Sequence, residues 1–146
     1  MRLLAFRIRN FRSIVDSGLK YLSSDNITVL IGQNESGKTS VLEALKAFSD
    51  GMITDDMLRS DLSLPEISCL FGLDAAELKE VTEVRGISPE VAEIIRKEKQ
   101  ILLVRNWNPD KSSVVRIGGE KVEEVYNNRL KVFQEEQDEL LKLAGE

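Results

Sequence analysis

One short segment of the sequence has the residue types and spacing that bind phosphate. It reads Gly32-Gln-Asn-Glu-Ser-Gly37-Lys38-Thr39, with two glycines separated by four residues and followed by Lys and Thr. Gly32 permits a tight exit from a strand, and Gly37 lets the backbone approach a phosphate closely. Lys38 would reach the β- and γ-phosphate oxygens, and the Thr39 hydroxyl would complete part of a Mg²⁺ shell. The segment therefore predicts binding of a nucleoside triphosphate with Mg²⁺.

Backbone groups would complete this phosphate cradle. The N–H groups of about residues 35–40 would point at the phosphates, and the next helix would add its positive N-terminal end. Lys38 is the candidate catalytic residue and Thr39 the candidate metal ligand. The full set of candidate ligands in the loop is Gly32, Asn34, Glu35, Ser36, Gly37, Lys38, Thr39 and Ser40.

The residues on either side of this loop have the patterns that such a loop requires. Residues 27–31 are almost uniformly apolar and β-branched, which predicts a strand covered on both faces. From Lys38 to Phe48 the apolar positions have helical spacing, which predicts a helix after the loop. A glycine turn that binds nothing is the alternative interpretation.

The rest of the chain alternates between strand and helix patterns. Residues 3–9 alternate in hydropathy, which predicts a half-buried strand. Asp74 and Glu77 have the spacing of a capping box, and Gly118-Gly119 predicts a hairpin leading into residues 121–122. The other expected elements are a connecting loop around a short helix at 49–65, strands at 67–73, 100–107 and 113–117, helices from Asp74 and Ser88, a turn at 108–111 and a short amphipathic helix at 123–143.

Composition restricts the function further. The 146 residues carry a formal net charge of −5, one cysteine and no histidine. These counts exclude histidine triads, histidine zinc sites and an internal disulfide, and they are consistent with a cytoplasmic location. No apolar run approaches the roughly 20 residues of a membrane span. Residues 1–48 carry seven basic and four acidic side chains, whereas residues 49–146 carry 13 and 21, so the phosphate loop lies in the basic part.

Two stretches together resemble a known family. They are Ile8-Arg-Asn-Phe-Arg-Ser-Ile14 and the segment from Ile27 to Leu45, which contains the phosphate loop. They resemble the N-terminal part of the ABC-type ATPases of the RecF, SMC and OLD (overcoming-lysogenisation-defect) group. The resemblance is dense over residues 3–48 and thinner over 65–117. The Asn-Glu-Ser form of the loop is most similar to OLD-type proteins.

The resemblance implies an α/β fold, in which a P-loop NTPase part is joined by an antiparallel β-meander lobe and helices. It implies ATP and Mg²⁺ as cofactors, head-to-tail homodimerisation around nucleotide, and ATP hydrolysis coupled to DNA processing or repair. For OLD-type members it also implies a nuclease domain further along the chain. Residues 1–64 would hold the strand, P-loop and first helix, 65–122 a β/α lobe, and 123–146 a helix.

Two parts that this group needs for hydrolysis are missing from the sequence. One is an apolar strand that ends in Asp-Glu, and the other is a Ser-Gly-rich signature segment. The run ending at Asp74 is the nearest candidate, but Ala75 follows it, and Asp74 is better explained as a helix cap. Gln100 is better explained as a surface residue than as a γ-phosphate sensor. We therefore expect residues 1–146 to be part of a longer ATPase and inactive alone.

Three arginines near the N-terminus allow two interpretations. In the functional one, Arg12 lies near the nucleotide, while Arg7 and Arg9 form a face that contacts DNA phosphates. In the other, they lie on the solvated face of an edge strand. Trp107 is expected to pack in the core, and Arg105 beside it has no assigned role.

Other classes of P-loop protein remain as alternatives. A GTPase should carry Asn-Lys-x-Asp for guanine, which does not occur in the sequence. A small kinase should have a lid rich in arginine after the loop. Residues 49–75, which would form that lid, contain a single arginine, Arg59. A module that binds nucleotide for assembly or regulation, without hydrolysis, also stays open.

Overall fold

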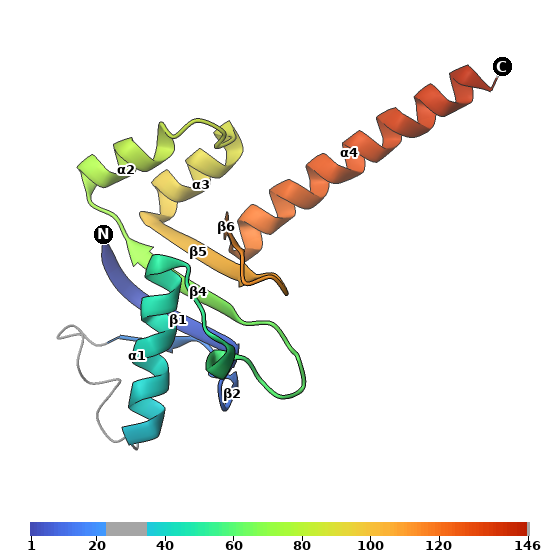
Figure 1. The fold of residues 1–146 in the computed structure, drawn as a ribbon. Helices are drawn as coiled ribbons and strands as arrows, with labels where there is room; N and C mark the ends of the chain where they lie inside the picture. Colours follow the sequence, from blue (N-terminus) through green and yellow to red (C-terminus); the bar gives the residue numbers. More distant parts are fainter. Residues whose placement is uncertain (23–34, 146) are drawn as a thin grey trace.

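The computed structural model describes residues 1–22 and 35–145, apart from the side chains of residues 35–38 (Figure 1). Its centre is a six-stranded antiparallel sheet in the order β2-β1-β4-β5-β6, with β3 also paired to β1. The strands are β1 (Arg2–Phe11), β2 (Ile14–Asp16), β3 (Lys20–Tyr21), β4 (Glu66–Gly72), β5 (Gln100–Trp107) and β6 (Ser113–Ile117). The expected antiparallel arrangement is seen in β4, β5 and β6, although two helices separate β4 from β5 in the chain.

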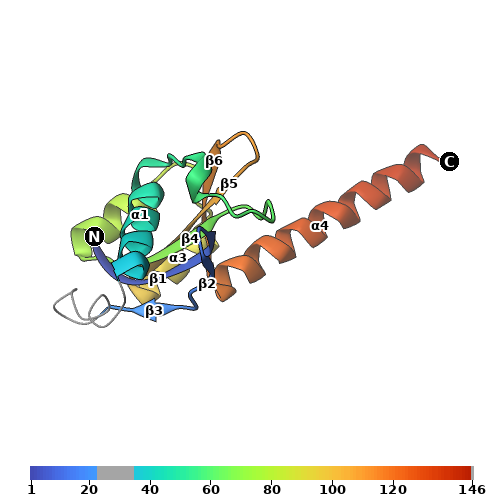
Figure 2. The same cartoon turned by 60° about the horizontal axis from the view of Figure 1, so that its bottom comes forward.

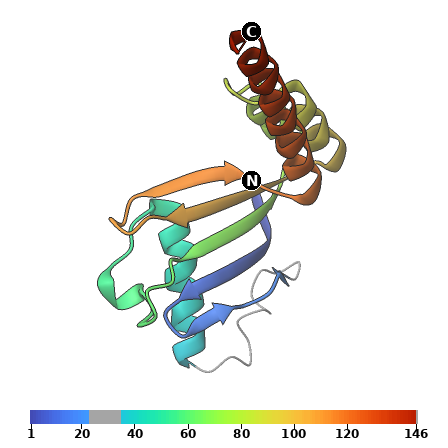
Figure 3. The same cartoon turned by 90° about the vertical axis from the view of Figure 1, so that its right-hand side faces the viewer.

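The helices lie on one face of this sheet and at one end of it. They are α1 (Glu35–Asp50), the 3₁₀ helix η2 (Asp55–Met57), α2 (Ala75–Thr82), α3 (Pro89–Glu98) and α4 (Glu120–Ala144). Figure 3 shows α1 crossing one face of the sheet, while Figure 2 shows α4 extending away from the rest of the molecule. The short helix expected within 49–65 is therefore confirmed as η2.

The main core lies between α1 and the sheet. On α1, Val41, Ala44 and Ala47 recur every three residues, and all three are buried. They pack on alternate residues of the strands, which point to the same face. A shift of register between Leu3 and Ala5 interrupts the alternation expected in the first strand. The buried residues of this core are Phe6, Ile8, Phe11, Val41, Ala44, Ala47, Ile53, Ile67, Cys69 and Trp107.

A second core lies beneath α2, α3 and the start of α4. Its buried residues are Leu73, Val91, Ile95, Ile101 and Val122. The predicted capping box is confirmed, because the Glu77 N–H donates to Asp74 and the Asp74 N–H donates to Glu77. The predicted start of α3 is also confirmed, since Ser88 accepts from the Val91 N–H. Side-chain caps therefore set the beginning of both helices, as expected from the sequence.

Two expectations for the C-terminal region are wrong. Gly118-Gly119 does not form a hairpin: Gly119, with φ at 107°, is the N-cap residue of α4, which begins at Glu120. Residues 121–122 are helical because Val122 packs into the second core, where it is 4% exposed. The last helix is also long rather than short, with 25 residues.

The sheet brings together segments that are distant in the sequence. β1, from the 1–64 segment, pairs with β4, from the 65–122 segment, over the length of β4. β1 therefore lies inside the sheet, and the edge-strand interpretation of its arginines is wrong. The strand expected at 27–31 lies outside the described residues.

Candidate functional site

The helix expected from Lys38 begins earlier, at Glu35 within the motif, so Gly37 and Lys38 lie in its first turn. The first four N–H groups of a helix have no acceptor within it, and the helix dipole adds partial positive charge there. The start of a helix is therefore suited to phosphate oxygens. The expectation that the motif opens a helix is therefore confirmed.

Several candidate ligands are not described at the level of their side chains. Gly32 and Asn34 lie outside the described residues, as do the side chains of Glu35, Ser36, Gly37 and Lys38. Their contacts with nucleotide stay predictions from the sequence.

Thr39 and Ser40, the next two residues of α1, lie in different environments. Thr39 is exposed, which gives its hydroxyl the access that a Mg²⁺ ligand requires. Ser40 is 7% exposed, because it lies one helical turn before the buried Ala44, on the side of α1 that packs on the sheet. The donor type and exposure of Thr39 therefore fit the predicted metal role, whereas the Ser40 side chain is shielded from solvent.

The C-terminal end of α1 is fixed to β5 by two side chains. Arg105 Nε donates to the Phe48 carbonyl oxygen at 2.8 Å, and the guanidinium carbon lies 5.8 Å from the centre of the Phe48 ring. Arg105 Nη1 also donates to Ser113 Oγ at 2.7 Å. Trp107 Nε1 donates to the Gly51 carbonyl oxygen at 3.1 Å. Carbonyl groups at the C-terminal end of a helix lack donors within the helix and favour a cation, and Arg105 supplies one. Arg105 and Trp107 together therefore hold the end of α1 against β5.

A glycine is required where the chain leaves this anchor. Gly51 has φ at 75°, in the left-handed region, and a Cβ there would lie 2.7 Å from Arg105 Nη1. Any other residue at Gly51 would therefore strain the backbone and displace the guanidinium. Gly51 is the signal in the sequence for the end of α1. No pattern in the sequence indicated that Arg105 would contact this end of the helix.

Arg12 joins three segments of the molecule. It lies in the turn between β1 and β2 with φ at 52°. Its N–H donates to the Met57 carbonyl at 2.9 Å, and its carbonyl accepts from Arg59 Nη1 at 3.0 Å. Its Nη2 forms ion pairs with Glu43 of α1 and, at 3.1 Å, with Asp56. The turn, α1 and η2 are thus tied together through Arg12.

The charge of Arg12 is matched by these two carboxylates. A hydrogen bond from the Thr54 hydroxyl lowers the pKa of Asp56, with a further contribution from Arg12, which keeps Asp56 ionised. Glu43 is eight residues beyond Glu35, or about 12 Å along the axis of α1 from its start. One of the two interpretations from the sequence placed Arg12 near the nucleotide, but neither identified Glu43 and Asp56 as its partners. The acidic pair Asp55-Asp56 was the available signal for one of them.

Arg7 and Arg9 project from the face of the sheet opposite α1, and both form ion pairs with acidic side chains. Arg7 makes a bidentate contact with Asp16, at 3.0 Å from Nε and 2.6 Å from Nη2. This hydrogen bonding holds the pKa of Asp16 well below its usual range. Arg9 lies 3.9 Å from both Asp16 and Glu66. Because two carboxylates balance two guanidinium groups, the arrangement favours a solvated sheet face over a basic DNA-binding face.

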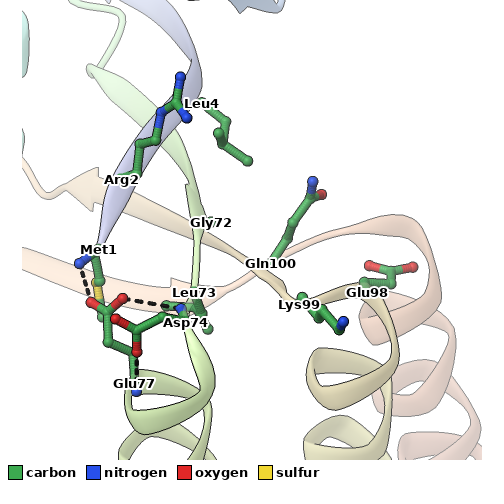
Figure 4. A pocket seen from close by; sticks show the side chains of 10 residues that line it. All are labelled: Met1, Arg2, Leu4, Gly72, Leu73, Asp74, Glu77, Glu98, Lys99 and Gln100. Carbon is green, nitrogen blue, oxygen red and sulfur yellow. Dashed lines mark hydrogen bonds and ion pairs between the residues drawn. The ribbon is translucent and has the colours of Figure 1, made fainter. Parts of the chain in front are cut away.

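A pocket of about 560 Å³ lies where β1 begins and α2 and α3 meet the sheet (Figure 4). The Met1 amino group pairs there with Glu77, and Lys99 and Gln100 line the opposite side. None of Arg12, Thr39 or Ser40 lines this pocket. It is therefore separate from the described part of the candidate phosphate site.

Possible metal-ligating side chains were compared across the described residues. Within residues 1–22 and 35–145, no three His, Cys, Asp or Glu side chains gather as a metal site. Asp74 is used as a helix cap, as expected from the sequence. Burial raises the pKa of the Cys69 thiol to about 12, so this residue is an uncharged core side chain at neutral pH.

No helix in the described part of the chain is both long and apolar enough to span a membrane.

Comparison with known proteins gives three findings. A family model described as an AAA ATPase domain matches residues 1–144. A 70-residue stretch is 40% identical to the DNA replication and repair protein RecF of Chlorobium luteolum, and covers 48% of this chain but only 16% of that protein. A solved chain from work on ATP-driven dimerization and DNA-stimulated activation of SMC ATPases superposes with a TM-score of 0.51 and 17% identity, over 84% of this chain and 75% of that one.

These findings agree with the phosphate motif and with the antiparallel sheet beside α1. The structural likeness to the SMC ATPase concerns the fold alone. The family match extends over nearly the entire chain and includes both the motif and the sheet. The chain therefore belongs to the AAA ATPase domain family.

Proposed function

We propose that residues 1–146 form the N-terminal nucleotide-binding part of an ATPase of the RecF and SMC type. The observation that carries this proposal is the start of α1 at Glu35, three residues after Gly32, so that Gly37, Lys38 and Thr39 lie in the first turns of the helix. A helix start with a lysine and glycines at these positions binds a polyphosphate. The family match supports adenine as the base.

Each candidate ligand has a specific role in this proposal. Lys38 neutralises the β- and γ-phosphates, and Thr39 supplies an oxygen to Mg²⁺. The bound Mg²⁺ would neutralise charge between the β- and γ-phosphates. The backbone N–H groups of the loop and first turn hold the phosphates in place.

The wider activity of the protein is also a proposal. We infer that hydrolysis requires an Asp-Glu strand end and a signature segment from outside residues 1–146, so that this part alone binds ATP without turnover. In the assembled protein, ATP-dependent homodimerisation would be coupled to DNA processing or repair in the cytoplasm. An OLD-type affiliation, with a nuclease further along the chain, rests on the Asn-Glu-Ser loop alone.

A regulatory or assembly module is the second candidate function. It is favoured by one observation: Asp74, the nearest candidate in the sequence for a catalytic carboxylate, caps α2 instead. Such a module would bind ATP through the same loop but would gain no turnover when the rest of the protein is present.

A nucleotide titration tests the proposal. Calorimetric titration of residues 1–146 should show Mg-dependent ATP binding that is at least about 10-fold tighter than GTP binding, a difference of about 1.4 kcal/mol. Phosphate release should stay at the background rate. Equal affinity for the two nucleotides would contradict the adenine assignment, and rapid turnover would show that the chain contains a catalytic carboxylate.

The role of Arg12 can be separated from its structural ties. We propose that its guanidinium contacts nucleotide after leaving Asp56, so Arg12→Ala should weaken Mg-ATP binding by about 10-fold, as for loss of a charge-assisted hydrogen bond. Asp56→Asn weakens the tie but keeps the guanidinium, so it should leave the affinity unchanged or increase it. Equal losses in both variants, measured by the same titration, would make Arg12 a purely structural residue.

A further inference from the structure

The turn between β1 and β2 has an unusual residue at its tip. Phe11 pairs with Ile14, so Arg12 and Ser13 are the two central residues of the turn. Arg12 has φ at 52°, in the left-handed region. Where the first central residue of a two-residue hairpin turn needs a positive φ, glycine is the residue commonly found, because a side chain is strained there. The chain therefore has an arginine where glycine would cost less.

Contacts with the segment after α1 hold Arg12 in this conformation. The Arg12 N–H donates to the Met57 carbonyl oxygen at 2.9 Å, and the Arg12 carbonyl oxygen accepts from Arg59 Nη1 at 3.0 Å. A strained backbone conformation persists only where the surrounding structure fixes it. Both backbone polar groups of Arg12 are thus fixed by residues 57–59.

The two contacts depend on the sequence in different ways. The contact with Met57 uses a backbone carbonyl, which any residue at that position would supply. The contact with Arg59 uses a side chain, which is 22% exposed and whose Nε lies 3.6 Å from Asp61 Oδ2. Because only this second contact depends on residue type, Arg59 is the residue whose substitution should release the turn.

Buried polar atoms without hydrogen bonds gather around the same turn. Among the described residues, three buried side-chain nitrogen or oxygen atoms have no hydrogen-bond partner: Arg12 Nε, Glu43 Oε2 and Arg59 Nε. The Glu43 oxygen does form an ion pair with Arg12 Nη2. Such atoms are uncommon in protein interiors, and each requires an explanation. Their concentration beside a strained arginine indicates a functional cluster rather than a purely structural one.

We propose that Arg59 is a positioning residue, which fixes the turn so that the Arg12 guanidinium is directed toward α1. Arg59 acts through the Arg12 carbonyl and does not itself contact nucleotide. The inference rests on the proposed contact between Arg12 and the nucleotide. Without the hydrogen bond from Arg59, the turn would relax toward a less strained conformation. The Arg12 guanidinium would then lose its fixed place beside Glu43.

Amide hydrogen exchange in the chain without nucleotide tests this positioning directly. The Arg12 N–H should be protected, because its exchange requires the turn to separate from Met57. Arg59→Ala removes a cationic donor and should lower the protection of the Arg12 N–H by about 10-fold or more, as measured by NMR. Arg59→Lys keeps one cationic donor and should hold this protection within about threefold of that in the unsubstituted chain.

Lys111→Ala is the matched control for the exchange measurement. Lys111 Nζ pairs with Asp55 of η2 at 2.6 Å, so this variant also removes a cation that contacts the segment after α1. It leaves both backbone contacts of Arg12 in place, and the protection of the Arg12 N–H should change by less than about twofold. The Ala92 N–H, which donates to the Ser88 carbonyl oxygen in α3, should keep its protection in every variant and shows that the chain remains folded.

A double-mutant cycle connects the turn to nucleotide binding. In calorimetric titrations with Mg-ATP, Arg59→Ala should weaken binding by about fivefold when Arg12 is present. In the Arg12→Ala background, the same substitution should weaken binding by less than about twofold, because Arg59 acts only through Arg12. A substitution that merely loosened the fold would weaken binding in both backgrounds.

The outcomes that would overturn the proposal are distinct from those that test the nucleotide site. Unchanged protection of the Arg12 N–H in Arg59→Ala would show that Arg59 does not hold the turn. Equal losses of ATP affinity in the two backgrounds would show that Arg59 does not act through Arg12, and no loss in either would overturn the proposal as well. If the unsubstituted chain binds no ATP, the proposed function fails, whereas the exchange measurement still decides whether Arg59 holds the turn.

Discussion

Replacing Lys38 with alanine is expected to weaken Mg-ATP binding by about 100-fold or more. The ammonium group is the one side-chain cation within the phosphate loop, and it would meet phosphate oxygens that carry most of the charge of the ligand. Loss of an interaction worth about 3 kcal/mol corresponds to this change in affinity. The measurement is calorimetric titration of each variant with ATP at constant Mg²⁺.

A lysine on the same helix supplies the matched control. Lys46 is exposed on α1, two turns beyond Lys38, so Lys46→Ala removes the same charge from the same element. The affinity of the Lys46→Ala variant for ATP should stay within about twofold of that of the unsubstituted chain. An exposed charge two helical turns from the phosphate loop is largely screened. If Lys38→Ala binds ATP as tightly as Lys46→Ala does, the loop is a glycine turn and not a phosphate site.

The largest effect on stability is expected at Trp107. Its side chain is 2% exposed, lies in the core beneath α1 and donates a hydrogen bond to Gly51. Trp107→Ala should therefore lower the free energy of unfolding by about 3–5 kcal/mol through the lost apolar contacts and the cavity left behind. The free energy of unfolding is measured by urea titration followed by circular dichroism. Tryptophan fluorescence cannot be used, because Trp107 is the only tryptophan and the substitution removes it.

Tyr126→Ala provides the comparison for this substitution. Tyr126 is an aromatic residue on α4 that is 43% exposed, so its truncation should cost less than about 1 kcal/mol. Equal losses of unfolding free energy in Trp107→Ala and Tyr126→Ala would show that Trp107 does not occupy the core. A Trp107→Ala variant with a lower thermal midpoint but an unchanged free energy of unfolding would contradict the prediction as well.

Local patterns were enough to predict most of the elements. Asp74 and Glu77, three residues apart, marked a helix start because both groups satisfy free backbone N–H groups there. Pro89 marked another, since its missing N–H is not needed at the first helical position. Alternating hydropathy in 67–73 indicated a strand with one face on the core. Each of these signals depends only on neighbours within a few residues.

The features that the sequence did not predict depend on distant contacts. The pairing of β1 with β4 joins residues about 60 positions apart, and no short-range pattern encodes it. Arg12 finds Glu43 and Asp56 only when the turn, α1 and η2 are assembled. Gly119 was compatible with either a hairpin or a helix start, and the burial of Val122 determined the outcome. The phosphate loop itself was predicted by its chemistry, because its residues act through local backbone geometry.

The anchoring of α1 has a mechanical consequence. Its 16 residues form a helix about 24 Å long, with the proposed phosphate-binding turn at one end and the Arg105 and Trp107 contacts at the other. If nucleotide binds as proposed, α1 would connect it rigidly to β5, because a hydrogen-bonded helix resists compression. A displacement of β5 would then move the whole helix relative to the bound phosphates. A movement of the first turn toward the nucleotide would likewise displace β5.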